Sequence, residues 1–332
     1  MALERTPERA YAMERKIADD LGRSYGLYPT NVAPVQGGWL NRKWKIECEG
    51  GPMLVKQYSY ERFSAGKLAL IEEALERQMR LEERGVPCPH ILPYEGRAIR
   101  FLDGGTAYMV MRYCPGRIVN CDTVTEAQMC SLGSACGQIH REFMRLPHRG
   151  VRGYPLYSGG LAASLREHLQ TCEKTLTADV PQAYRSAVRG QEAILRSLTD
   201  GCFDGCPLGI AHEDFTPDNM LFLDDEVSAV LDFDRNQYSF LWHDVARALL
   251  SLALKDGRMV RGRIRAFADG YASFRPLETG DIARALRVAG CIEFPWWIRR
   301  DVFESESPKL QRFLKEMRFL TEHWFELDDV IG

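Results

Sequence analysis

The spacing of apolar and polar residues predicts strands in the first third of the chain and helices in most of the rest. Trp44 and Ile46 alternate with charged neighbours, as in a strand that buries one face. Glycine and proline interrupt such runs and mark the turns between them. The elements expected up to residue 113 are a helix over 8–22, three strands within 34–58, a helix over 65–84, and strands over 98–102 and 107–113.

After Cys114-Pro115-Gly116, apolar residues recur mainly at helical spacing. A strand-rich part followed by a helical part predicts an α+β protein with two lobes, 1–113 and 119–332. A short connector at 114–118 joins them. The elements expected in the second lobe are helices over 125–145, 161–175, 181–199, 241–255, 258–274, 279–290 and 308–325, and hairpin strands over 220–223 and 227–231.

The composition is that of an ordinary globular protein, with 45% hydrophobic and 27% charged residues among 332. The formal net charge of −3 gives no general attraction to nucleic acid or anionic membranes, so neither partner is expected. No apolar run approaches the roughly 20 residues that span a bilayer. The charged N-terminus is unlike a signal peptide, and a cytoplasmic location is expected. Ten irregularly spaced cysteines favour reduced thiols over a zinc site.

The expected hairpin carries polar residues at its open end. Folded about a turn at 224–226, with Leu223 opposite Val227, it brings Asn219 and Asp232 side by side. An amide oxygen and a carboxylate that meet at one point form the kind of site that Mg²⁺ prefers. The pattern therefore predicts a magnesium site at this end of the hairpin.

Asp214 precedes the hairpin, in a loop that can curl back over this pair. A carboxylate within reach of a hydroxyl is what phosphoryl transfer requires. The pattern H-x-D-F-x-P-x-N over 212–219, followed by L-D-F-D over 231–234, resembles the catalytic and metal loops of the protein-kinase-like superfamily. It is most similar to the small-molecule branch, which includes aminoglycoside phosphotransferases, choline kinases, homoserine kinases and kinase-like spore-coat proteins.

The resemblance implies a role for each of these residues. Asp214 would be the catalytic base, Asn219 and Asp232 would bind Mg²⁺, and His212 would position the loop. Glu213 stands where the family usually has glycine, and this extra acid would either repel phosphate or attract a cationic substrate. The two-lobed plan is also that of kinases, with a nucleotide-binding first lobe and the catalytic loop and substrate site in the helical second lobe.

Lys56, at the end of the third expected strand, matches the family lysine that contacts the α- and β-phosphates and pairs with a helix glutamate. Glu72 falls within the apolar stripe of the helix expected over 65–84. A buried acid needs a partner, so Glu72 is expected to pair with Lys56. The alternatives are that Glu72 reaches solvent at the edge of the stripe, or that Glu76 is the partner. The stripe consists of Leu68, Ile71, Leu75 and Met79.

Gly37 and Gly38, followed by Asn41, resemble the family's phosphate-binding turn, although no Walker A sequence follows. Glycines there let the backbone approach phosphate closely. The connector of kinase-like folds binds adenine through its backbone. The resemblance therefore implies ATP as a cofactor, with the adenine beside Met111, Arg112, Tyr113 and Cys114.

Three further features have two interpretations each. Asp244 either caps the helix that follows it or braces the catalytic loop. Asp234 is either a neighbour of a second metal or a carboxylate that binds a loop amide. The segment 293–301, with Trp296 and Trp297, forms either an aromatic wall with a cationic rim for an anionic or ring-bearing substrate, or internal packing with solvated arginines.

The sequence is thus expected to encode an ATP- and Mg²⁺-dependent phosphotransferase that moves the γ-phosphate to a hydroxyl of a small molecule. A non-catalytic kinase-like binding or spore-coat-type protein is the first alternative. A metal hydrolase using His212, Asp214, Asp232 and Asp234 is the second, and it leaves Lys56 unexplained. The acceptor, the preferred nucleotide and the oligomeric state stay open.

Overall fold

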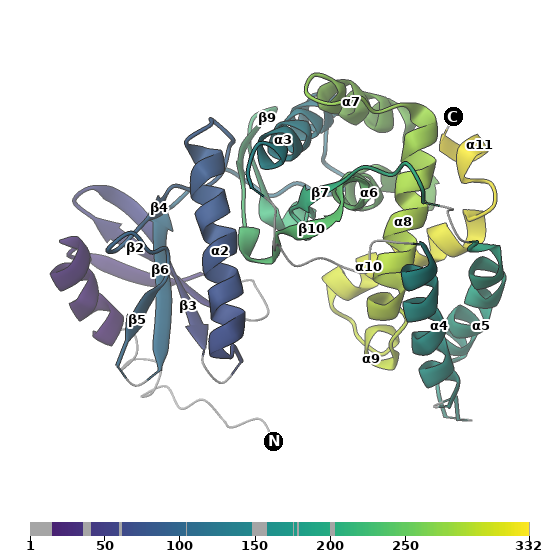
Figure 1. Ribbon diagram of the computed structural model, residues 1–332, viewed down its shortest axis with the longest axis horizontal. Coiled ribbons are helices and arrows are strands. Elements are labelled where there is room, and N and C mark those ends of the chain that lie inside the picture. The colour runs from purple at the N-terminus through teal and green to yellow at the C-terminus, as the bar shows by residue number, and fades with distance from the viewer. Residues whose placement is uncertain are drawn as a thin grey trace. The chain divides into compact units, whose positions relative to one another are not determined.

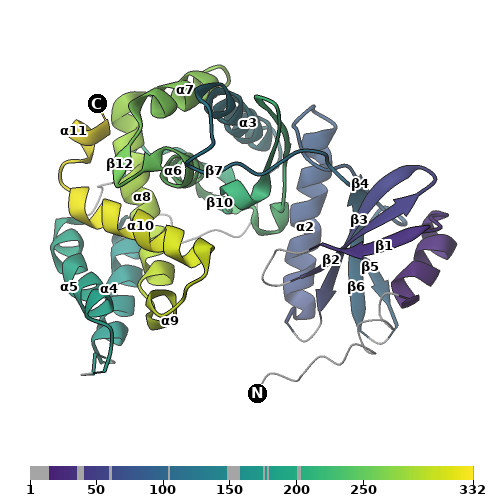
Figure 2. The same ribbon diagram turned by 180° about the vertical axis from the view of Figure 1, so that it is seen from behind.

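The computed structural model describes residues 15–35, 41–59, 62–103, 105–147, 158–174, 176–177, 179–199 and 203–331. These residues fall into two compact units, which Figures 1 and 2 show from opposite sides. Unit 1 contains the described residues up to Glu83 and the segment Cys88–Cys114. Unit 2 contains Arg84–Pro87 and the described residues from Pro115 on. No helix within these ranges is long and apolar enough to cross a membrane.

Unit 1 is built on one antiparallel sheet. The strand order is β1-β2-β3-β6-β4, and β5 also pairs with β6. Successive residues of a strand point to opposite faces of the sheet, and apolar side chains occur on both faces, so each face can be buried against a helix. The strands are β1 (Asn31–Pro34), β2 (Arg42–Cys48), β3 (Gly51–Ser59), β4 (Ile91–Leu92), β5 (Arg100–Leu102) and β6 (Thr106–Arg112).

Helices cover the two faces of this sheet, as both views show (Figures 1 and 2). α2 (Ala65–Glu82) packs against the face that carries Met109. Helical residues 15–20 and the π-helix η1 (Leu21–Tyr25) pack against the other face. Opposite residues of an antiparallel pair share a face, so Lys56, which pairs with Met109, lies on the α2 side.

α2 closely follows its predicted bounds. The Ser64 side chain caps its first turn by accepting a hydrogen bond from the Lys67 amide, and Gly85 follows its end with a φ of +75°. The predicted apolar stripe faces the sheet, and Glu72 is buried with it. The carboxylic acid Glu72 therefore lies in the core of unit 1, on the buried side of α2.

Unit 2 is mainly helical, with α6 at its centre (Figure 1). Every residue of α6 is buried, including the polar residues His243, Asp244, Arg247 and Ser251. The helices are α3 (Glu126–Met144), α4 (Ser158–Lys174), α5 (Gln182–Ser197), α6 (Leu241–Leu252), α7 (Arg261–Ala272), α8 (Thr279–Trp297), α9 (Arg300–Phe303), α10 (Pro308–His323) and α11 (Leu327–Ile331). The strand pairs are β7 (Leu208–Ala211) with β10 (Gln237–Phe240), β8 (Met220–Leu223) with β9 (Glu226–Val230), and β11 (Leu254–Lys255) with β12 (Arg258–Met259).

Helices α3 and α7 lie side by side at very close range, as both views show. A Cβ atom added to Gly270 would lie 1.9 Å from the carbonyl oxygen of Cys130, and one added to Gly133 would lie 2.0 Å from that of Phe267. Only glycine permits this approach. The contact places His140 of α3 beside Tyr271 of α7, and both side chains belong to the site described below.

The predicted register of the hairpin is correct at its open end, where Met220 pairs with Val230 and Leu221 with Ala229, and wrong by one position beside the turn. Leu223 pairs with Glu226, and Phe222 pairs with Val227, so the turn contains Asp224 and Asp225 alone. Asp224 has a φ of +50°, a conformation that aspartate tolerates in two-residue turns. The pairing shifts between Leu221 and Phe222, so the open end still brings the flanking residues together.

Candidate active site

The catalytic loop, residues 212–219, connects β7 to β8 and ends in the 3₁₀-helix η2 (Pro217–Asn219). The carbonyl oxygen of Asp214 accepts hydrogen bonds from the Thr216 amide at 2.9 Å and from Nδ2 of Asn219 at 2.9 Å. The loop therefore curls back on itself, as the sequence predicts. Because Nδ2 of Asn219 donates to this carbonyl, the side-chain oxygen Oδ1 is the atom of Asn219 that can ligate a cation.

His212 fixes the loop from within. Its Nε2 donates to the Leu231 carbonyl at 2.9 Å, and its Nδ1 accepts from the Asp214 amide at 3.3 Å. Its ring also meets that of Phe233 edge to face, with 4.5 Å between the centroids. His212 thus connects Asp214 to the residue before Asp232, which is the geometry expected of a positioner.

Asp232 lies two residues beyond the end of β9 and directly precedes the 3₁₀-helix η3 (Phe233–Arg235). The Leu231 amide donates to the Asn219 carbonyl at 2.7 Å, so the two expected metal ligands come from adjoining backbone segments. Asp232 has a left-handed backbone, with φ +65° and ψ +55°. Such a conformation costs a non-glycine residue about 1–3 kcal/mol and is typical of functional sites.

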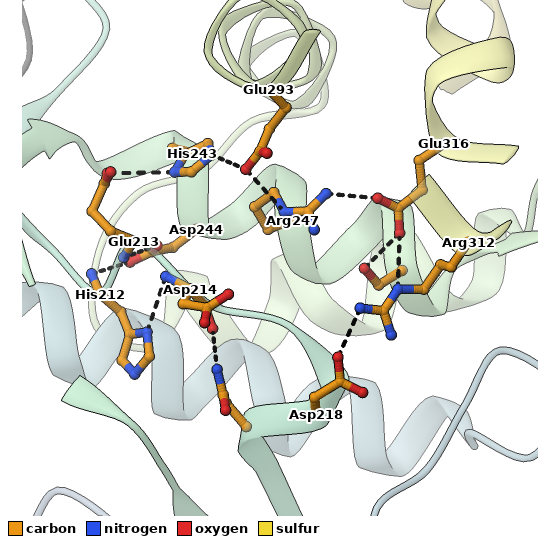
Figure 3. A network of polar contacts seen from close by, with 12 residues as sticks. His212, Glu213, Asp214, Asp218, His243, Asp244, Arg247, Glu293, Arg312 and Glu316 are labelled. Atoms are coloured by element: carbon orange, nitrogen blue, oxygen red, sulfur yellow. Dashed lines mark hydrogen bonds and ion pairs between the residues drawn. The ribbon is translucent and has the colours of Figure 1, made fainter. Parts of the chain in front are cut away.

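Asp244 braces the catalytic loop from the first half of α6 (Figure 3). Its Oδ2 accepts from the His212 amide at 2.6 Å and from Nε2 of His140 at 3.0 Å, and its Oδ1 accepts from the Glu213 amide at 2.9 Å. Burial alone would raise the pKa of Asp244, but the hydrogen bond from His140 and nearby histidine charges hold that pKa below its ordinary value. Phe240 is the N-cap of α6, so the brace is the correct interpretation and the cap is wrong.

His140 is a functional contact that sequence reasoning missed. It is fully buried on α3, and the Tyr271 hydroxyl lies 2.9 Å from its Nδ1. Its neighbours on the buried side of α3 include Cys136 and Phe143. A polar residue at that spacing on an apolar stripe is the signal that could have identified it, since a buried imidazole needs partners.

Glu213 does not face the open site. Its backbone φ is +68°, which explains why glycine is usual at this position. Its Oε2 accepts from Nε2 of Gln237 at 3.0 Å, and its Oε1 lies 3.4 Å from Nδ1 of His243. The residue is 7% exposed. Neither alternative drawn from the sequence, phosphate repulsion or attraction of a cationic substrate, fits a carboxylate buried in this way.

In unit 1, Lys56 and Glu72 are both buried, at 2% and 6% exposure. The Glu72 carboxylate accepts hydrogen bonds from the amides of Ala98 at 2.7 Å and Ile99 at 3.0 Å. Glu72 therefore does not reach solvent at the edge of the stripe. Glu76, the alternative partner, is exposed. The ion pair between Lys56 and Glu72 stays a prediction.

The backbone of the connector is partly engaged within unit 1. The Arg112 amide donates to the His90 carbonyl at 2.8 Å, and the Tyr113 amide donates to the Pro52 carbonyl at 3.1 Å. Of the amides proposed to bind adenine, that of Cys114 is the donor consistent with this pattern. Met111 is 8% exposed and belongs to the apolar cluster on the Lys56 face. Asn41 lies directly before β2, whereas Gly37 and Gly38 lie outside the described residues.

The segment 293–301 mostly packs internally. Trp297 is fully buried and stacks on Phe313, with 5.9 Å between the ring centroids. Arg299 pairs with Asp301, and Arg300 pairs with Glu304. Trp296, on the same segment, is 54% exposed. Of the two interpretations drawn from the sequence, internal packing is the correct one for Trp297, which belongs to the core. Asp234 lies in η3, and its role stays a prediction.

Comparisons with known proteins agree with this geometry. The profile of the phosphotransferase enzyme family matches residues 31–277. The homoserine kinase of Xanthobacter autotrophicus is 27% identical over 274 residues, which cover 78% of this chain and 76% of that protein. The homoserine kinase of Methylobacillus flagellatus is 26% identical over 284 residues, which cover 83% and 81%.

Solved structures share the fold over nearly the whole chain. The amicoumacin kinase hAmiN superposes with a TM-score of 0.67 at 15% identity, covering 97% of each chain. A spectinomycin phosphotransferase superposes with a TM-score of 0.61 at 13% identity, covering 96% of this chain and 97% of that one. At these identities the likeness shows the fold alone.

These findings confirm the expected α+β kinase-like fold. They also confirm the expected enzyme class, a phosphotransferase with a small-molecule hydroxyl as acceptor, over the non-catalytic alternative. The family match covers well over half of the sequence and includes both the lysine strand and the catalytic loop. This chain belongs to the phosphotransferase enzyme family.

Proposed function

We propose that this protein transfers the γ-phosphate of Mg·ATP to a hydroxyl group of a small molecule. The observation that carries the proposal is the frame of hydrogen bonds around Asp214. His212 accepts the amide N–H of Asp214, and Asn219 donates to its carbonyl oxygen. This frame holds the backbone on both sides of a partly exposed carboxylate, as a base that meets an incoming hydroxyl requires.

The residues at the end of the hairpin fit a magnesium ion. Asn219 offers an amide oxygen, Asp232 offers a carboxylate, and both are hard oxygen donors. Magnesium in nucleotide sites uses one or two such protein ligands and completes its shell with phosphate oxygens and water. A larger cluster of acidic side chains is therefore not needed.

Lys56 fits the phosphates of a nucleotide. A buried ammonium is costly unless it meets negative charge, and the phosphates of ATP would supply that charge. Glu72 would keep the lysine in place from α2. When bound, Mg·ATP supplies the phosphoryl group and the metal charge that neutralises it.

In the proposed reaction, the hydroxyl oxygen of the acceptor forms a bond to the γ-phosphorus while the bond from that phosphorus to the β–γ bridging oxygen breaks. Asp214 orients the hydroxyl and accepts its proton at the carboxylate, then returns it to solvent. His212 keeps the loop in register and takes no proton from the substrate. Rate enhancement would come from positioning and charge neutralisation.

The acceptor belongs to the chemical range that the relatives' names span. Homoserine, amicoumacin and spectinomycin are small and polar, and each of these names belongs to a kinase or phosphotransferase similar to this chain. We propose that this protein likewise acts on a small, polar, hydroxyl-bearing compound, and that it does so in the cytoplasm, where ATP is available.

A thermal unfolding assay tests the nucleotide site. A ligand at 100 times its dissociation constant stabilises a protein by about 2.7 kcal/mol, which raises the melting temperature by a few degrees. Mg·ATP should produce this shift in the wild type and not in Asp232→Gly, because glycine keeps the left-handed backbone and removes only the carboxylate. An equal shift in both proteins would contradict the assignment of Asp232. No shift in a folded wild type would favour the non-catalytic alternative.

A further inference from the structure

A chain of charged side chains joins the two ends of the catalytic loop through the interior of unit 2 (Figure 3). Acidic and basic groups alternate along it, and each lies within 3.5 Å of the next. In order, the members of this charge chain are Glu213, His243, Glu293, Arg247, Glu316, Arg312 and Asp218, and the successive distances are 3.4, 3.0, 3.4, 2.6, 3.5 and 2.9 Å.

The two ends of the charge chain lie in the loop, and its middle lies in three helices. Glu213 is the residue directly before Asp214, and Asp218 is the residue directly before Asn219. α6 supplies His243 and Arg247 at i, i+4 spacing, α10 supplies Arg312 and Glu316 at the same spacing, and α8 supplies Glu293. The chain therefore ties three helices to the neighbours of the proposed base and of the proposed metal ligand.

Burying these charged side chains costs free energy, so the arrangement is better explained by its effect on geometry than by a gain in stability. His243, Arg247 and Glu316 are 2%, 3% and 1% exposed. Buried ion pairs contribute little net stability compared with apolar packing, yet breaking one of them is expensive. Such a chain therefore specifies where its end groups lie more than it stabilises the fold.

The charged states of His243 and Glu293 keep positive and negative groups alternating along the charge chain. Burial alone would lower the pKa of His243, but Glu213 and Glu293 raise that pKa to about 10. Burial alone would raise the pKa of Glu293, but Arg247 and His243 lower it to about 2. At neutral pH the His243 imidazole is thus positive and the Glu293 carboxylate is negative.

Glu213 needs this support because its backbone is strained. A φ of +68° is easy for glycine and costs another residue about 1–3 kcal/mol. Asp244 holds the Glu213 amide, and His243 and Gln237 hold its carboxylate. The backbone dihedrals at 213 set the direction in which Asp214 leaves the loop, so whatever holds Glu213 also directs the base.

We propose that Glu213 is a positioning residue for Asp214, and that the charge chain makes α8 and α10 part of the framework that orients the catalytic loop. The inference rests on the proposed function only in naming Asp214 as the base. Glycine would adopt the left-handed backbone at position 213 without strain. Glu213 adopts it too, and its side chain is held there by contacts with unit 2. Arg312 performs the equivalent task at the other end, where it holds Asp218 beside Asn219.

The test compares Glu213→Gly with Asp256→Gly. Both remove a non-glycine side chain at positive φ, but Asp256 lies in an exposed turn between β11 and β12, outside the charge chain. Two properties are measured: the kinetics of phosphotransfer, as kcat and KM, and the hydrogen–deuterium exchange of the amides of residues 212–219 in the free protein. In Glu213→Gly, kcat should fall about tenfold or more with KM within about twofold, since misplacing a positioned group is costly. Amide exchange should quicken. Asp256→Gly should change neither quantity.

Two further variants keep the test decisive. Glu213→Gln retains a group that can accept from Gln237 and should recover part of the lost kcat. Arg312→Gln acts at the other, partly exposed end and should also quicken exchange across 212–219, so it serves if Glu213→Gly does not fold.

Unchanged kcat and unchanged exchange in folded Glu213→Gly would overturn the proposal. Its failure differs from failure of the proposed function. If the wild type transfers no phosphate, faster exchange in Glu213→Gly and Arg312→Gln still supports the positioning role. If the wild type is active and the variants leave both kcat and exchange unaltered, the charge chain is only internal packing.

Discussion

Two residues with left-handed backbones adjoin the proposed reacting groups. Glu213 precedes Asp214, and Asp232 is itself a proposed metal ligand. The other described non-glycine residues at positive φ are Glu95, Asp224 and Asp256, each of which lies in a turn. Outside turns, a strained backbone conformation persists only where surrounding contacts enforce it. Backbone conformation therefore marks the same site that the motif marks.

The charge on His243 gives a prediction for the pH dependence of stability. Its pKa in the folded protein, about 10, lies above its ordinary value of 6.5 because Glu213 and Glu293 outweigh burial. The stabilisation is thus complete below about pH 6.5 and is lost as pH rises towards 10. Urea unfolding between pH 6 and 10 should show a steeper decline in stability for the wild type than for His243→Gln. Parallel declines would show that His243 is not charged in the native protein.

Sequence reasoning proposed residues for the site but could not predict the partners that hold them. The resemblance of one loop to a kinase-like motif selected His212, Asp214 and Asn219, and the apolar stripe of α2 correctly predicted a buried Glu72. The partners come from distant segments and leave no local signal. Ala98 and Ile99, which hold the Glu72 carboxylate, were expected to lie in a strand. His243 and Glu293, which pair with each other, are 50 positions apart.

At the scale of elements, helices were predicted more reliably than the hairpin register. The bounds of α2 and α3 follow from caps and apolar spacing that the sequence shows. The turn of the hairpin is set by contacts with α3. The Thr125 hydroxyl donates to Asp225, and Gln128 donates to the Asp224 carbonyl at 2.7 Å. A register that depends on such distant contacts cannot be read from alternation alone.

The close packing of α3 on α7 predicts a large effect of a small substitution. Gly270→Ala would place a Cβ atom 1.9 Å from the Cys130 carbonyl, so the helices must separate. We expect a loss of about 2 kcal/mol or more in unfolding free energy, because backbone atoms cannot yield as side chains do. Gly66→Ala, in the first turn of α2, meets nothing within 4 Å and should be neutral or slightly stabilising. Chemical denaturation measures both, and equal effects would contradict the packing argument.

At the scale of the whole molecule, each unit carries a distinct part of the predicted chemistry. Unit 1 carries Lys56, Glu72 and the connector up to Cys114, and unit 2 carries the catalytic and metal loops. The order of these features along the chain was sufficient to predict the fold class, which the comparisons confirm. The substrate was not predictable, because no sequence motif marks the side chains that would contact it.

The most direct test of the account is phosphate transfer itself. Purified protein is incubated with Mg²⁺, γ-labelled ATP and a panel of small hydroxyl compounds that includes homoserine and spectinomycin. The account predicts labelled product from at least one acceptor with the wild type and with the surface control Asp256→Asn. It predicts a loss of about 100-fold or more in kcat with Asp214→Asn, the range typical of a general base. Full transfer by Asp214→Asn would contradict the assignment of the base, and no transfer to any acceptor by folded, nucleotide-binding wild type would contradict the proposed function.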